Sequence, residues 1–195
     1  MTSASERAGV ALRALSAAAG RAAAELSADV GRYADLAIET LEGGGRLLFC
    51  GNGGSAATVE HIATEYLVRF QREREPLPAI ALTAGSALLT AAANDFGYDQ
   101  VFVRSLRALG RAGDLLIVHS TSGASPNCLA AARTAREIGL RTVALTGASG
   151  GELAGLADLA ILAPADATAT IQEIHLAIEH AVADHLDAHF AGERP

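Results

Sequence analysis

Residues 47–65, LLFCGNGGSAATVEHIATE, constrain the fold of this chain more than any other stretch. A short apolar run at 47–50 stops at a glycine-rich turn, residues 51–54, and a helix-like segment begins at Ser55. A short apolar run bounded by glycines is typical of a buried strand, and glycine lets the backbone adopt positive φ and lets a ligand come close. The pattern predicts a strand, a tight turn and a helix N-terminus, where unpaired N–H groups and the helix dipole favour an anion such as phosphate.

His61 and Glu65 follow on the same segment, four residues apart, so both side chains project from one face of the expected helix. On most helices such a pair is only a solvated surface contact. Here it follows a turn suited to phosphate, and an imidazole beside a carboxylate can bind a metal or transfer protons. We therefore interpret the pair as part of a site for chemistry on a phosphorylated small molecule.

A second loop has a similar arrangement. Residues 115–118 are apolar, HSTSGAS follows at 119–125, and a helix-like segment begins near Pro126, which a first helical turn tolerates. A lone serine commonly caps a helix or forms a turn, but this loop concentrates four hydroxyl groups that suit a phosphate. They are Ser120, Thr121, Ser122 and Ser125. All 15 basic residues are arginine, so neither loop is a Walker A motif, and Schiff-base catalysis through lysine is excluded.

Strand-like and helix-like segments alternate after residue 45. Strands are expected near 46–50, 79–83, 114–119, 141–146 and 158–162, and helices near 55–70, 86–93, 99–109, 126–138, 151–156 and 168–190. Such alternation predicts right-handed βαβ units, hence an α/β fold: a three-layer α-β-α sandwich around a five-stranded parallel sheet. Ligands then bind beyond the carboxyl ends of the strands, where both loops fall.

Two further helices are expected before this core, at 4–27 and 29–42. They have no strand partner, so they either pack against another subunit or cover the sheet of their own chain. We predict a single domain over 1–195, with the N-terminal helices in 1–44 and the α/β core in 45–195.

Composition narrows the function classes. The formal net charge of −7 argues against a nucleic-acid binder. The two cysteines, Cys50 and Cys128, form no CxxC motif and are expected to be reduced thiols in a cytoplasmic protein. No apolar run reaches the length of a membrane span, and arginines interrupt the alanine-rich start, so we expect neither a membrane partner nor a signal peptide.

An ordered set of motifs extends over roughly residues 45–190. It comprises GNGGSA at 51–56, His61 and Glu65, NDFGYDQVF at 94–102, STSG at 120–123 with Ser125, LTG at 145–147, GELAGLAD at 151–158, IQEIH at 171–175 and His180. The set resembles the sugar isomerase (SIS) domain family and, within it, the bacterial phosphoheptose isomerases, which interconvert sedoheptulose 7-phosphate and glycero-manno-heptose 7-phosphate. STSG alone is a weak signal, but the ordered set is specific.

The resemblance implies roles for individual residues. Sugar contacts fall on Asn52, Gly53 and Gly54, and phosphate contacts on Ser55, Ser120, Thr121, Ser122 and Ser125. Further substrate contacts fall on Glu65, Asn94, Asp95 and Gln172, although an Asx-type turn before Gly97 explains Asn94 and Asp95 equally well. A divalent metal, expected to be zinc, would be held by His61, Glu65, Gln172 and His180.

Gln172 and His180 are eight residues apart, about 12 Å along a helix axis and about 80° around it. Reaching one small metal from a single straight helix would stretch both side chains. We infer that His180 serves a site different from that of its own Gln172, which would place the active site at a subunit interface. This agrees with the homotetramer with shared sites that the resemblance implies.

The expected reaction is a ketose–aldose isomerisation through a cis-enediol. We expect Glu65 to act as the base and His180 as the acid that serves the carbonyl and hydroxyl oxygens. A metal could polarise the carbonyl or only fix the site, and the sequence does not separate these roles.

Four positions depart from the family pattern. Ala124 stands where Asn is usual, and His119 replaces an aliphatic residue before STSG. Ala169 and Thr170 stand where some relatives carry Asp and many carry Arg, which removes charge from the loop above the site. The substrate could therefore be another seven- or eight-carbon sugar phosphate.

Two other functions compete with the isomerase. One branch of the family binds the bacterial replication initiator DnaA without catalysis, and residues 76–110 resemble that branch as much as the isomerases. That branch lacks the Glu and His that match Glu65 and His180, so we favour the enzyme. The other alternative, a sugar-phosphate sensor attached to a transcription regulator, is disfavoured because the chain has no helix-turn-helix segment or basic domain.

Overall fold

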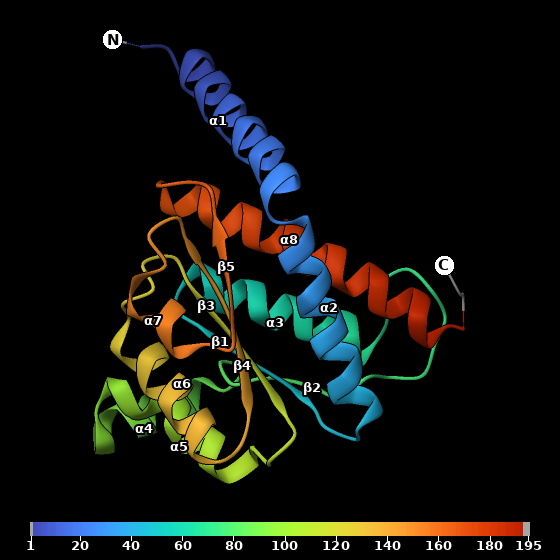
Figure 1. Ribbon diagram of the computed structural model, residues 1–195. Coiled ribbons are helices and arrows are strands. Elements are labelled where there is room, and N and C mark those ends of the chain that lie inside the picture. The colour runs from blue at the N-terminus through green and yellow to red at the C-terminus, as the bar shows by residue number, and fades with distance from the viewer. Residues whose placement is uncertain (1, 193–195) are drawn as a thin grey trace.

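A computed structural model describes residues 2–192 and shows one five-stranded sheet between two layers of helices (Figure 1). The strands are β1 Leu47–Gly51, β2 Ala79–Ala81, β3 Leu115–Ser120, β4 Arg141–Gly147 and β5 Leu159–Ala163. Their order is β2-β1-β3-β4-β5, and all neighbours are parallel. The predicted α-β-α sandwich is thereby confirmed, and the carboxyl ends of all strands share one edge.

The helices are α1 Ala4–Glu25, α2 Ser27–Glu42, α3 Gly54–Leu67, α4 Ser86–Phe96, α5 Val101–Leu109, α6 Pro126–Glu137, α7 Gly151–Leu156 and α8 Thr168–Phe190, with a 3-10 turn, η1, at Tyr98–Gln100. Successive strand residues point to opposite faces. Leu47 and Phe49 pack with α2, α3 and α8, whereas Leu48 and Cys50 pack with α4 to α7. Both faces are therefore buried, which explains why the strands are continuous apolar runs rather than alternating ones.

Several boundaries differ from those predicted. The expected 4–27 helix ends at Glu25, α4 continues to Phe96, and the expected 99–109 helix is divided into η1 and α5. The expected 55–70 helix ends early, at Leu67. Its apolar pattern continues, but the backbone N–H groups of Gln71 and Arg72 are bound by the Asp187 carboxylate on α8, so the chain turns away from the helix axis.

The two N-terminal helices behave differently. α2 lies over the sheet beside α8, with Tyr33, Ala34 and Ala37 buried, so it covers the sheet of its own chain. α1 extends away from the body of the molecule (Figure 1), and Ala18 is its one buried residue. Val10 and Leu12 on α1 are 59% and 67% exposed. One alternative therefore applies to each helix. α2 covers the sheet of its own chain, whereas α1 leaves apolar side chains exposed that another subunit could cover.

No helix within residues 2–192 is both long enough and apolar enough to cross a membrane.

Candidate active site

The first loop connects β1 to α3. Gly53 adopts φ 57°, which permits the tight turn, and the N–H of the buried Ser55 donates to the Asn52 carbonyl oxygen at 3.0 Å. A side chain on Gly51 would place a Cβ 2.9 Å from the Ser55 Cβ and 3.0 Å from the His119 carbonyl oxygen. Glycine is thus required where this loop passes β3.

The side chain of Asn52 is held by two residues that the sequence did not single out for the site. Its Nδ2 donates to Asn127 Oδ1 at 2.9 Å, and its Oδ1 accepts from Asn127 Nδ2 at 2.8 Å and from the Tyr98 hydroxyl at 3.0 Å. Tyr98 lies within the NDFGYDQVF motif, which was a usable signal, whereas Asn127 follows Pro126 without any motif of its own. These bonds fix the shape of the glycine turn.

The second loop, residues 120–125, follows β3 and carries the four hydroxyls. Ser120 Oγ donates to Ser125 Oγ at 3.3 Å, and Ser122 Oγ accepts from the Ala124 N–H at 3.2 Å. A cavity of about 310 Å³ adjoins this loop. Thr121 and Ser122 line it, with Ser149 after β4 and Thr168 at the start of α8. Hydroxyls and a helix N-terminus meet there, a combination that favours a phosphate group.

The second loop packs directly on the turn after β4. The Gly147 N–H donates to the Thr121 carbonyl oxygen at 3.0 Å, and the Leu153 N–H donates to the Gly123 carbonyl oxygen at 2.9 Å. Gly123 adopts φ 61°, and a Cβ added there would overlap the carbonyl oxygen of Gly150. The backbones of the 120–125 loop and of the turn after β4 are in direct contact here. The absence of a side chain at Gly123 therefore sets the position of the 120–125 loop.

α3 and α8 bring three of the predicted residues together within one chain. His61 Nε2 lies 3.5 Å from Glu65 Oε1 and 3.1 Å from His180 Nε2. Phe70 stacks on the His180 ring with centroids 5.3 Å apart. The two Nε2 atoms face each other, so at most one carries a proton in a hydrogen bond between them.

Gln172 lies elsewhere on α8. A Cβ added to Gly54 would lie 2.5 Å from Gln172 Oε1, so this amide packs against the first turn of α3. His61 is seven residues further along α3, about 10 Å on the axis. The eight-residue spacing thus places Gln172 beside the glycine turn and His180 beside His61.

The positions of His61, Glu65, Gln172 and His180 decide which of them could bind the expected metal within one chain. Two imidazoles and a carboxylate are donors that suit zinc. Among residues 2–192, however, no group of three or more His, Cys, Asp or Glu side chains has the arrangement of a metal site. The chemistry of His61, Glu65 and His180 fits zinc, whereas Gln172 of the same chain lies apart from them.

Asn94 and Asp95 are exposed in the last turn of α4, where Asn94 Nδ2 donates to Asp95 Oδ1 at 2.8 Å. Both residues lie inside the helix rather than in a turn before Gly97. A substrate contact of these two side chains stays a prediction, and it is Tyr98, after the helix, that reaches the first loop.

A buried polar cluster lies beneath the loops. His119 Nε2 lies 2.7 Å from Glu179 Oε1, and the Tyr33 hydroxyl donates to Glu179 Oε2 at 3.0 Å. His175 Nε2 lies 3.0 Å from the Thr146 carbonyl oxygen. Burial and the neighbouring His119 lower the pKa of His175 to about 3, so His175 is neutral and structural. His119 precedes Ser120 and Glu179 precedes His180, so one buried pair joins the hydroxyl loop to the helix that carries His180.

The two thiols are free, as predicted, and both are buried. The neighbouring Cys128 and burial raise the pKa of Cys50 well above its ordinary value. Cys50 therefore remains a protonated core residue behind the first loop and is no nucleophile.

Known proteins with similar sequences belong to the family that the motifs of this chain resemble. Residues 12–147 match the family model of the SIS domain. The phosphoheptose isomerase of Roseiflexus sp. is 52% identical over 151 residues, which cover 77% of each chain. That of Akkermansia muciniphila is 44% identical over 172 residues, 88% of this chain and 91% of the relative.

Solved structures are similar over nearly the whole chain. The phosphoheptose isomerase of Neisseria gonorrhoeae superposes with a TM-score of 0.91 at 38% identity, covering 95% of this chain and 100% of the other. The enzyme from Francisella tularensis gives a TM-score of 0.92 at 36% identity, covering 95% and 99%. The resemblance read from the motifs is confirmed: this chain belongs to the phosphoheptose isomerases of the SIS domain family.

Proposed function

We propose that this protein is a ketose–aldose isomerase that converts sedoheptulose 7-phosphate to glycero-manno-heptose 7-phosphate through a cis-enediol. The observation that carries the proposal is the meeting of His61, Glu65 and His180 between α3 and α8. In the same chain, β1 and β3 both end in loops whose composition suits a phosphate group. The non-catalytic alternative, a protein that binds DnaA, has no need of this acid–base group.

The chemistry follows from the donors present. Glu65 takes a proton from C1 of the ketose and returns it at C2, while a proton moves from O1 to O2 with the help of His180. In the tautomer in which His180 Nε2 accepts from His61, the proton that His180 can transfer is on its Nδ1. His61, Glu65 and His180 would hold a zinc ion, with Gln172 as a ligand supplied at a shared site. Bound zinc supplies Lewis-acid polarisation of a carbonyl oxygen.

Purified protein should convert sedoheptulose 7-phosphate to the aldose, which NMR detects directly. A chelator should abolish turnover, zinc should restore it, and His61→Ala protein should contain less metal than the parent in elemental analysis. Turnover that is unaffected by the chelator, with no metal in either protein, would exclude the metal but not the isomerase. Absence of turnover with either seven- or eight-carbon ketose phosphates would overturn the isomerase.

We place the protein in the cytoplasm as a homotetramer with shared active sites. Ser55 and Glu65 lie ten residues apart on α3, about 15 Å along its axis, a long reach for one sugar phosphate within a single chain. α1 projects from the body (Figure 1). An apolar groove of about 350 Å³ lies between α1, α2 and α8. A second copy seated there would cover the small apolar side chains of α1 that line the groove, Ala19, Ala22 and Ala23. Light scattering measures the assembly's mass directly.

Phosphate recognition should depend on neutral hydroxyl donors. Thr121→Val removes one donor at almost constant volume, and losing a hydrogen bond to a charged group costs about 1.5–3 kcal/mol, so KM should rise about ten- to a hundredfold. The unphosphorylated ketose should bind more weakly still. If Thr121→Val has the KM of the parent, and the unphosphorylated ketose has the KM of the phosphorylated one, the 120–125 loop only forms a turn and caps a helix.

A further inference from the structure

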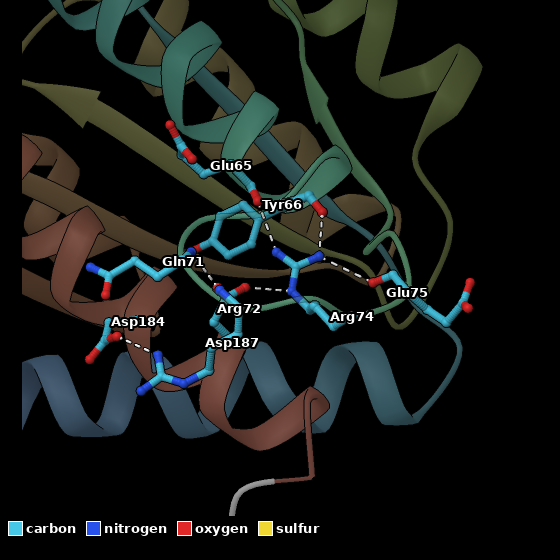
Figure 2. A network of polar contacts seen from close by, with 8 residues as sticks. All are labelled: Glu65, Tyr66, Gln71, Arg72, Arg74, Glu75, Asp184 and Asp187. Atoms are coloured by element: carbon cyan, nitrogen blue, oxygen red, sulfur yellow. Dashed lines mark hydrogen bonds and ion pairs between the residues drawn. The ribbon is translucent and has the colours of Figure 1, made fainter.

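Arg74 lies in the segment between α3 and β2, and its side chain is only 1% exposed. Figure 2 shows its guanidinium pointing at the end of α3. Nη2 donates to the Glu65 carbonyl oxygen at 2.8 Å, and Nη1 donates to the carbonyl oxygens of Tyr66 at 2.9 Å and Glu75 at 3.1 Å. Nε donates to Asp187 Oδ1 at 2.6 Å.

α3 needs such a partner because it ends without glycine. Its C-terminal cap is Val68, with φ −101° and ψ −81°. The last carbonyls of a helix have no partner within the helix, and a cation near them also meets the negative end of the helix dipole. Arg74 supplies the charge and donates to the carbonyl oxygens of Glu65 and Tyr66, the second of which also accepts the Leu77 N–H at 3.0 Å.

Asp187 holds Arg74 in place from α8. Its side chain is fully buried, and Oδ2 accepts the backbone N–H groups of Gln71 and Arg72 at 2.7 Å each (Figure 2). Burial alone would raise the pKa of Asp187, but the bonds from Arg72 and Gln71 and the Arg74 guanidinium outweigh it and hold the pKa below its ordinary value. The carboxylate is therefore charged at neutral pH, and the pair links the 68–78 segment to α8.

Stability alone does not account for this pair. Removing two charges from water costs free energy that their attraction often only just recovers, and well-packed apolar residues frequently serve as well. The geometry offers another reason. Glu65 lies in the last turn of α3, where an unsecured helix frays, and a catalytic group must be held to within about 0.5 Å of its working position.

We propose that Arg74 and Asp187 are positioning residues, which fix the last turn of α3 and thereby hold Glu65 beside His61 and His180. The inference rests on the proposed role of Glu65 as the base. Asp187 lies two helical turns beyond His180 on α8, so the pair ties the helix of the base to the helix of the acid.

The test is the double variant Arg74→Met with Asp187→Asn, which leaves no unpaired buried charge and retains an oxygen for the Gln71 and Arg72 N–H groups. We expect kcat to fall about 10- to 100-fold, because small misplacements of catalytic groups cost that much, while KM changes less than about threefold. Hydrogen exchange of a peptide spanning residues 60–70 should accelerate. Arg74→Lys keeps the charge but not the fan of donors, so it should also lose kcat while remaining folded.

Asp184→Asn is the matched control, because it removes the half-buried Arg72–Asp184 ion pair of 2.7 Å from the same segment without touching α3. Its kcat should equal that of the parent. Parental kcat in Arg74→Lys, or parental kcat and exchange in the double variant, would overturn the proposal. If the double variant does not fold, Arg74→Lys decides. If Glu65→Gln is inactive while the Arg74 variants are fully active, only the positioning role of Arg74 and Asp187 is refuted. If Glu65→Gln is active, the proposed role of Glu65 as the base is refuted.

Discussion

Glu65→Gln should lower kcat by about 10²- to 10⁴-fold, the contribution typical of a positioned general base, and leave folding intact. The amide has the shape of the carboxylate but cannot accept the C1 proton. It can still lie beside His61, whose Nε2 is 3.5 Å from Glu65 Oε1 in the parent. Turnover is followed by NMR, and folding by circular dichroism and thermal unfolding.

Glu60→Gln provides the control for this substitution. Glu60 lies on the same helix and is exposed, so the same loss of charge should leave kcat unchanged. Near-normal turnover in Glu65→Gln would show that another group removes the proton, and equal losses in both variants would point to the net charge of the helix.

Gly123→Ala should lower the free energy of unfolding and also weaken substrate binding. The positive φ of 61° costs an alanine about 1–2 kcal/mol, and relieving the overlap with the Gly150 carbonyl costs roughly another 1–3 kcal/mol. The loops after β3 and β4 must separate, which moves Thr121 and Ser122 and should raise KM more than about tenfold. Urea unfolding and steady-state kinetics measure the two effects.

Gly155→Ala is the matched control. Gly155 lies within α7, is exposed, and has no atom within 4 Å of an added Cβ. An alanine there should leave KM unchanged and raise stability by up to about 1 kcal/mol, as for a helical glycine. Coincident unfolding curves for Gly123→Ala and the parent would mean that the two loops do not pack as described.

The sequence by itself determined the elements and their order. Five short apolar runs that alternate with helix-like segments predict a parallel sheet with both faces covered, and the structure confirms it. The same local reasoning placed the two loops at the carboxyl ends of β1 and β3, and the four-residue spacing placed His61 and Glu65 on one helix face. These properties depend on residues close together in the chain. Local backbone geometry sets the strands and turns, and the repeat of the helix decides which side chains share a face.

Local patterns could not decide which distant residues meet: the resemblance implied a common site for His61 and His180, and the tertiary structure decided the remaining contacts. His180 lies 119 residues from His61 in sequence, and Asp187 lies 113 from Arg74, yet each pair is in contact. His119 and Glu179, 60 residues apart, form a buried pair for which only His119 stood out, as a departure from the family pattern. The end of α3 is the plainest case, since its helical pattern continues to residue 70. Hydrogen bonds from Gln71 and Arg72 to Asp187 end the helix, because a buried carboxylate on α8 binds those N–H groups in place of the helix's own carbonyls.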